Sequence, residues 1–407
     1  MGRTPLRAFT AFAAVCALSV AGCGGSDDDN AGSGGSGASS NGELSATVGV
    51  IGPKTGPAPQ FYETNTVGAQ LAAADAEKQY GVKIKLVNAD DQGTPEGASR
   101  AVQEQLNGGN VDALLASPQS GQALQTADVL QRSRIPWFIN AQSPQIINYK
   151  IKPNWAFRTA YNSSELSDVL GPFVFSGNAK VGLVHSADGF GQSEAEALQA
   201  TAKKQGKTLA AVEPLQPGAS DYTAAVRRLK QAGVTRVYMS ITSGSDTATV
   251  TKAMVQEDFE PDFKITNATI LADFGELARP AQWKNLVFID PRDLVDGAAK
   301  SLNADFKAKT GKEPPLPTNV YTSYMAINAY AQAVKAAGST DKAAVRDALE
   351  KLPSIDVRGD KIANPFTADS HDAYHAATPK DWFIFGFDDK GEITKRGTVA
   401  EEIESGS

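Results

Sequence analysis

Residues 180–205 read KVGLVHSADGFGQSEAEALQATAKKQ and contain one strand followed by one helix. The run 180–185 is apolar and rich in valine, which is typical of a buried strand. A loop with two glycines leads into the run 192–205, which is typical of a helix. Because a helix commonly joins one parallel strand to the next, this stretch predicts a parallel sheet covered by helices.

The same alternation continues on both sides of this stretch. Around it, we predict strands at 209–213, 236–240 and 264–267 and helices at 164–175, 222–231 and 247–256. An earlier series has predicted strands at 47–51, 83–88, 113–116 and 136–140 and helices at 67–80, 95–106 and 122–132. Two successive series predict an α/β fold with two doubly wound parallel-sheet lobes.

The last third of the chain determines how the sequence is divided between the two lobes. We predict helices at 294–309, 318–337 and 341–352 and a strand at 382–387. Because an open sheet edge needs cover, we expect the helices to return to the first lobe and the strand to the second, with three crossings in all. The predicted division is 44–161 with 293–355 for lobe 1 and 162–292 with 356–407 for lobe 2.

Residues 1–22 have the composition of a secretory signal peptide, because Arg3 and Arg7 precede an apolar run too short to span a bilayer. The run ends in Val20-Ala21-Gly22-Cys23, which resembles the lipobox of bacterial lipoproteins. The resemblance implies a lipid on Cys23 and a location on the extracytoplasmic face of a bacterial cell membrane. An ordinary secretory signal with an incidental cysteine is the alternative. Residues 23–43 are mostly small and polar and predict a lipid anchor followed by a flexible tether.

Charge and composition argue against several classes of protein. The 407 residues carry 39 Lys and Arg against 46 Asp and Glu, a net charge of −7, without the basic stripe that nucleic-acid binding needs. Both cysteines, Cys16 and Cys23, precede the predicted lobes, so no thiol nucleophile or disulfide is expected there. No Gly-x-Ser-x-Gly, P-loop or His-Glu-x-x-His pattern occurs. We therefore predict that the chain is not an enzyme and needs no cofactor.

Several short motifs occur in the order in which one family carries them. Residues 48–57, VGVIGPKTGP, resemble the opening of the branched-chain amino acid type of periplasmic binding protein, the extracytoplasmic component of an ABC importer. Further resemblances are LVNADD at 86–91, WAFRT at 155–159, GFG at 189–191, DY at 221–222 and the helix at 324–337. The resemblance implies two lobes that close on a ligand by a three-crossover hinge, the type I arrangement of these proteins.

In this family, hydroxyl and backbone N–H groups after the third and fourth strands hold a ligand carboxylate. The resemblance places this role on Ser117, Gln119 and Ser120 and, in the next loop, on Ala141 and Ser143. A helix N-terminus favours an anion, which supports the first group. For Ser120, helix capping alone is the other interpretation.

The resemblance also implies aromatic contacts to the ligand and a group that faces an ammonium. Phe61, Tyr62 and Phe190 stand where aromatic contacts are expected, although core packing explains one of the first two equally well. Amino-acid binders place an acid near Asn267, and here the nearest acid is Asp273. Because a buried ammonium needs a counter-charge, an amino acid, an amide and a small carboxylate all remain open as ligands.

His371 and His375 lie four residues apart, but two prolines bracket their segment and no third ligand is defined, so we predict no metal site. The sequence predicts a monomeric, lipid-anchored solute-binding protein that delivers a small polar ligand to ABC permease subunits. The alternatives are a ligand-sensing receptor domain that signals through a membrane partner, and an amidase-like enzyme on a similar scaffold.

Overall fold

The computed structural model describes residues 44–56, 58–108, 110–267 and 271–405. The predicted signal peptide, Cys23 and the tether lie outside these residues, as does the side chain of Asp273. None of the helices in the described part of the chain is long and apolar enough to cross a membrane.

The first sheet is built from residues 44–158, and all its strands are parallel. In spatial order it contains β2 (Val82–Asp90), β1 (Leu44–Gly52), β3 (Ala113–Leu115), β4 (Trp137–Ile139) and β5 (Ala156–Arg158). The crossover helices are α1 (Pro59–Tyr80), α2 (Pro95–Asn107) and α3 (Ser120–Ser133). The helix predicted at 67–80 is therefore longer, because Pro59 occupies its first turn and Gly81, in a left-handed conformation at φ 66°, ends it.

The second sheet has five parallel strands and an antiparallel edge. Its order is β14 (Ile393–Thr398), β13 (Phe383–Phe387), β10 (Leu286–Asp290), β9 (Phe263–Asn267), β8 (Arg236–Ser240), β6 (Val181–Ser186) and β7 (Ala211–Leu215). Its helices are α4 (Ser163–Val174), α5 (Gly189–Lys204), α6 (Thr223–Gln231), α7 (Gly244–Gln256), α8 (Leu271–Leu277), α9 (Pro280–Trp283) and α13 (Val399–Ser405). The predicted α/β class with two sheets is confirmed, while β10 and β14 were not predicted.

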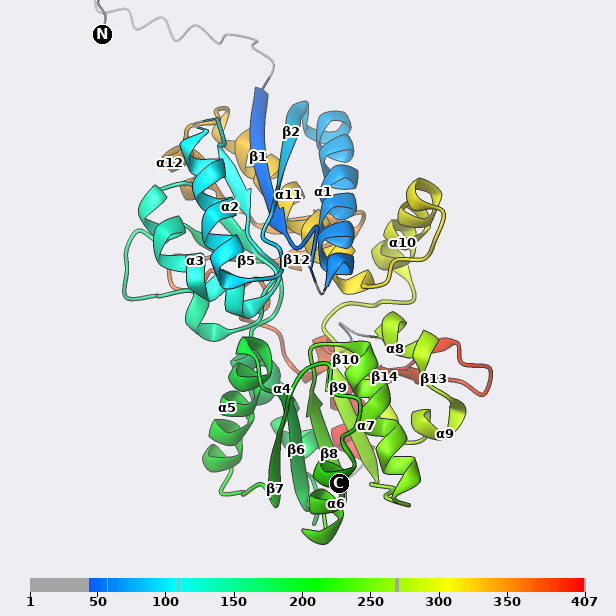
Figure 1. The fold of residues 1–407 in the computed structure, drawn as a ribbon. Helices are drawn as coiled ribbons and strands as arrows, with labels where there is room; N and C mark the ends of the chain where they lie inside the picture. The colour runs from blue at the N-terminus through cyan, green and yellow to red at the C-terminus, as the bar shows by residue number, and fades with distance from the viewer. Residues whose placement is uncertain (1–43, 57, 109, 268–270, 406–407) are drawn as a thin grey trace, which may run out of the picture. The chain divides into compact units, whose positions relative to one another are not determined.

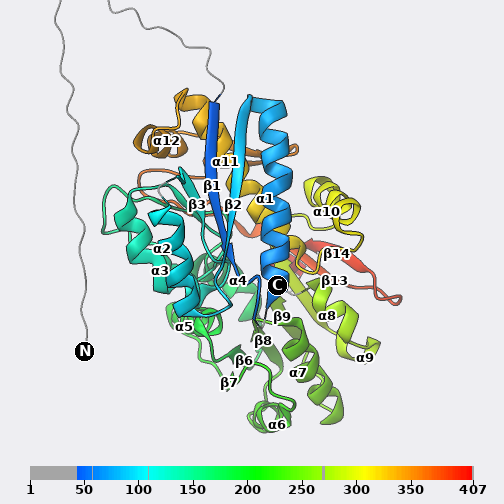
Figure 2. The same cartoon turned by 45° about the horizontal axis from the view of Figure 1, so that its top comes forward.

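Late segments of the chain return to the first sheet, as Figures 1 and 2 show for the gold helices beside the blue strands. These segments are α10 (Gly297–Thr310), α11 (Pro317–Ala337), α12 (Lys342–Leu349) and the hairpin of β11 (Ser354–Val357) and β12 (Asp360–Ala363). Helix α11 packs against α1 and against β11. The two helices approach closely at Gly68, where an added Cβ would lie 2.5 Å from the carbonyl oxygen of Val320.

Buried polar contacts join the crossing segments near Arg158, whose side chain is 0% exposed. Its Nη1 lies 3.0 Å from Oδ1 of Asp372, and its Nη2 donates to the carbonyl oxygen of Ser143 at 2.7 Å. The other Asp372 oxygen accepts hydrogen bonds from Tyr149 and Asn162. Residues 371–373 also hydrogen-bond the backbone of β5 at Arg158. The predicted boundary between the lobes at residue 355 stays a prediction.

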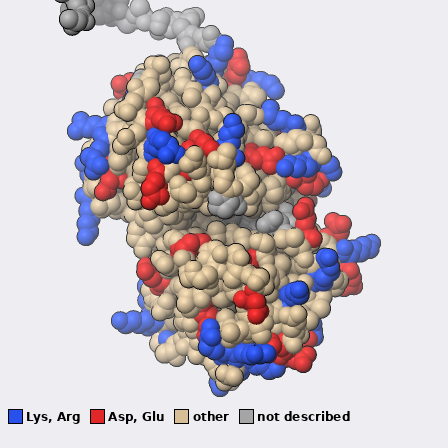
Figure 3. Space-filling view, in the orientation of Figure 1, with Lys and Arg blue, Asp and Glu red and all other residues tan. Residues whose placement is uncertain are grey.

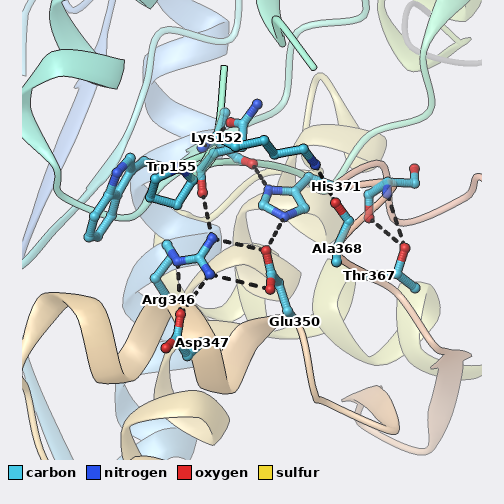
Figure 4. A network of polar contacts seen from close by, with 12 residues as sticks. Lys152, Trp155, Arg346, Asp347, Glu350, Thr367, Ala368 and His371 are labelled. Atoms are coloured by element: carbon cyan, nitrogen blue, oxygen red, sulfur yellow. Dashed lines mark hydrogen bonds and ion pairs between the residues drawn. The ribbon is translucent and has the colours of Figure 1, made fainter. Parts of the chain in front are cut away.

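His371 takes part in a network of polar contacts (Figure 4), which reaches β5 at Ala156. Its Nδ1 lies 2.7 Å from the carbonyl oxygen of Ala156, and its Nε2 lies 3.0 Å from Oε1 of Glu350, which also pairs with Arg346. The imidazole stacks on Phe157 with ring centroids 4.3 Å apart. Both ring nitrogens therefore have oxygen partners, and the described residues contain no group of three or more metal-ligating side chains.

Candidate functional site

A cavity of about 290 Å³ lies where the carboxyl ends of strands from both sheets meet. Open parallel sheets bind ligands at this end, because loops there lead into helix N-termini. Figure 3 shows the surface hollowed at the level between the two sheets, with Lys and Arg scattered over this face. Small-molecule sites usually occupy about 300–1,000 Å³, so the cavity suits a small ligand.

Loops of the first sheet supply one wall of the cavity. Residues 118–122 follow β3, and residues 140–142 follow β4. Helix α3 begins at Ser120 with Gln119 as its N-cap, and the Gln119 side chain accepts no hydrogen bond from the backbone of the first turn. The capping interpretation of Ser120 is therefore wrong. Its hydroxyl instead accepts a hydrogen bond from the backbone N–H of Ser143 at 3.3 Å.

The second sheet supplies the opposite wall. Residues 188–190 follow β6, Ile241 and Thr242 follow β8, and Asn267 ends β9. Asp188 is the only acid among the described residues that line the cavity. One of its oxygens accepts from the backbone N–H of Gly191 at 2.9 Å and the other from the Thr242 hydroxyl at 2.5 Å. Asp188 thus caps α5 and ties two loops of this wall together.

The structure brings six of the predicted site residues to the cavity and leaves three outside its lining. The lining residues are Phe61, Gln119, Ser120, Ala141, Phe190 and Asn267. Tyr62 lies beside Gly52 at the end of β1, and Ser117 is buried outside the lining. The Ser143 hydroxyl contacts Ser193 of α5 at 2.8 Å, so it joins the two walls. The side chain of Asp273, the nearest acid for a ligand ammonium, lies outside the described residues. Ligand binding by the other nine predicted site residues stays a prediction.

Sequence reasoning missed the groups that close one end of the cavity. Arg292 follows the unpredicted strand β10, and Thr318, Asn319 and Thr322 lie in the first turns of α11. The short apolar run LVFID at 286–290 was the signal that could have revealed β10 and hence the position of Arg292. No sequence pattern indicated that the first residues of α11 reach the cavity, because that helix was predicted only to cover the edge of a sheet.

Arg292 is 4% exposed and forms a two-point ion pair with the fully buried Asp290. Its Nε and Nη2 lie 2.5 and 2.6 Å from the two Asp290 oxygens. Its guanidinium carbon lies 5.9 Å from the ring centroids of Tyr161, Tyr321 and Tyr374. Burial works to lower the pKa of Arg292, but the Asp290 carboxylate outweighs it and raises this pKa above its ordinary value. Arg292 is therefore a fixed positive charge at the cavity.

A hydrogen-bonded cluster supports the wall behind Asn140. The Asn140 amide nitrogen donates to Asn65 of α1 at 3.2 Å and to Ser323 of α11 at 3.0 Å. Its amide oxygen accepts from the Thr159 hydroxyl at 2.8 Å. All four side chains are buried. These hydrogen bonds hold the Asn140 amide in one orientation, although the buried amide nitrogen of Asn65 has no partner among the described residues.

Comparisons with known proteins agree with this geometry. The family model described as periplasmic binding protein matches residues 45–391. The chain is 28% identical over 316 residues to the Leu/Ile/Val-binding protein homolog 3 of Brucella melitensis. That alignment covers 74% of this chain and 82% of the Brucella protein.

Two solved structures share the fold. The periplasmic binding protein type 1 of Bordetella pertussis Tohama I aligns with a TM-score of 0.73 at 22% identity, covering 87% of this chain and 100% of that one. A branched-chain amino acid transporter substrate binding protein from Streptococcus pneumoniae, in complex with isoleucine, aligns with a TM-score of 0.72 at 17% identity. That alignment covers 87% of this chain and 99% of the other.

Proposed function

Because this chain belongs to the periplasmic binding protein family, we propose that it captures a small polar ligand between its two sheets and delivers it to an ABC permease. The observation that carries the proposal is the cavity at the carboxyl ends of both sheets, lined by an uncapped helix N-terminus and a buried arginine. Hinge closure over such a cavity is a known way to enclose a ligand. Relatives named for binding leucine, isoleucine and valine support a ligand of amino acid size, whether an amino acid, an amide or a small carboxylate.

A ligand screen by thermal shift tests this function. A ligand that binds only the folded state raises the melting temperature, and at 100 times its Kd it stabilises by about 2.7 kcal/mol. We expect at least one amino acid, short amide or small carboxylate to shift the melting temperature of the purified protein after bound ligand has been stripped. A screen in which no member of these three classes produces a shift would contradict the proposed function.

The location we propose is the extracytoplasmic face of a bacterial cell membrane, with a lipid on Cys23. Stable anchoring needs two lipid signals, which fits the two or more acyl chains of a lipoprotein cysteine. A tether of about 20 residues spans roughly 25 Å as a flexible coil, enough to hold the protein beside a membrane permease. A single copy of the chain contains both walls of the cavity, so we propose that it acts as a monomer.

Replacement of Cys23 by serine tests the anchor. The variant cannot carry the thioether-linked lipid, so we expect it in the soluble extracytoplasmic fraction, whereas the unchanged chain stays with the membrane. Cell fractionation followed by immunoblotting measures this distribution. Replacement of Cys16 by serine is the control, because that residue lies inside the predicted signal peptide. Equal membrane retention of the Cys23 variant would contradict the lipid anchor.

A further inference from the structure

Three buried donors on cavity-lining residues at or near the start of α11 have no hydrogen-bond partner among the described residues. They are Nη1 of Arg292, Nδ2 of Asn319 and the hydroxyl of Thr318. Their residues are 4%, 6% and 2% exposed, and all three line the cavity. A buried donor without a partner costs about 1–3 kcal/mol, so these groups indicate where a ligand supplies the missing acceptors.

The residues of all three donors line the cavity near the start of α11. Thr318 and Asn319 are in its first turn, and Arg292 lies over the ring of Tyr321, one turn further along. The N-cap residue of this 21-residue helix, Leu316, makes no side-chain cap hydrogen bond, and no acidic residue occupies the first turn. The positive end of its dipole therefore adds to the charge of Arg292, and both favour an anion.

The other lining residues indicate what the rest of the ligand is like. Phe61, Pro118, Phe190 and Ile241 line the cavity and offer apolar contact to a hydrocarbon body. Asp188 already accepts hydrogen bonds on both oxygens, and Asp290 already binds two nitrogens of Arg292. The described lining thus provides one arginine, which is paired with Asp290, and one acid, Asp188, whose two oxygens both accept hydrogen bonds from the protein.

From these contacts we infer that the ligand is a small organic carboxylate without an ammonium group, bound through its carboxylate by Arg292 and Asn319. The inference rests on the proposed function and narrows its three ligand classes to one. Arg292 keeps its pair with Asp290 and offers the two N–H groups of Nη1 to the ligand. Hydrogen bonds between charged partners are about twice as strong as neutral ones, which favours an acid over the matching amide.

Matched ligand sets test the inference directly. The first set is 4-methylpentanoate, leucine and 4-methylpentanamide. Leucine is the same acid with an α-ammonium group, and 4-methylpentanamide is its amide. The second set is 3-phenylpropanoate, phenylalanine and 3-phenylpropanamide. We expect the Kd of the purified protein, measured by calorimetry, to be at least about 10-fold lower for one of the two acids than for its amino acid and its amide.

The variant Asn319→Asp tests the residue assignment. It keeps the shape of the side chain and places an acid in the first turn of α11, where the helix dipole stabilises it, so the fold is retained. The new carboxylate repels a ligand carboxylate, so we expect the Kd for the acid to rise at least about 10-fold while amide binding does not weaken. Asn178→Asp, at an exposed position away from the cavity, is the control with the same change in net charge.

The binding results distinguish a failure of the carboxylate assignment from a failure of the proposed function. Tighter binding of leucine or phenylalanine than of the matching acid would overturn the inference, as would unchanged acid binding by the Asn319→Asp protein. If neither acid binds while an amino acid or amide of the broad screen does, the carboxylate assignment fails and the proposed function stands. If nothing in the broad screen or the matched sets binds, both fail.

Discussion

Replacing Asp372 with alanine is expected to lower the free energy of unfolding by about 3–5 kcal/mol. The substitution leaves the guanidinium of Arg158, which is fully buried, without its charge partner. It also removes the acceptor of the Tyr149 hydroxyl at 2.7 Å and of the Asn162 amide at 3.1 Å. These groups come from separate parts of the chain at the crossings between the sheets, so their loss weakens the hinge.

Chemical denaturation followed by circular dichroism measures this change. Asp369→Ala is the matched control, because Asp369 lies in the same loop and is exposed, and we expect it to change stability by less than about 0.5 kcal/mol. The double variant Arg158→Met with Asp372→Leu removes both charges and should recover much of the loss, as replaced buried ion pairs often do. Equal stability of Asp372→Ala and Asp369→Ala would show that the ion pair does not support the hinge.

The fold class could be predicted because the alternation of strands and helices is a local property of the sequence. Strands such as β1, β6 and β8 are apolar runs between loops, and the helices that follow them are long enough to recognise. β14 escaped prediction because it is an edge strand, paired on one side only and rich in polar residues. β10 escaped because a run of four apolar residues before Asp290 does not by itself distinguish a strand from a buried helical turn.

The candidate site could be predicted only where its residues follow recognised strands. Gln119, Ser120 and Ala141 reach the cavity because they come directly after β3 and β4. Ser143 was assigned to the ligand, but its hydroxyl contacts Ser193, and a contact between segments so far apart leaves no local pattern. Arg292 and Asn319 were missed for the same reason, because only the folded chain brings the end of β10 to the start of α11.

Replacing Gly121 with phenylalanine is expected to weaken ligand binding at least about 100-fold. Gly121 lines the cavity in the first turn of α3, and apart from its chain neighbours and the backbone of its own helix, no heavy atom of the described chain lies within 4 Å of the place where a Cβ would stand. Its backbone is not in the left-handed region, so the backbone accepts a Cβ without strain. A phenyl ring at this position would occupy space in the cavity that the ligand needs.

The matched control is Gln125→Phe, which places the same ring on the exposed face of α3 outside the cavity. Circular dichroism and thermal melting establish that both variants keep the fold. The most direct test of a ligand site between the two sheets is calorimetric titration of a ligand from the screen into the unchanged protein and both variants. We expect the Gly121→Phe protein to lose binding while the Gln125→Phe protein retains it. A folded Gly121→Phe protein that binds the ligand as tightly as the unchanged chain would show that the ligand does not bind in the cavity between the two sheets.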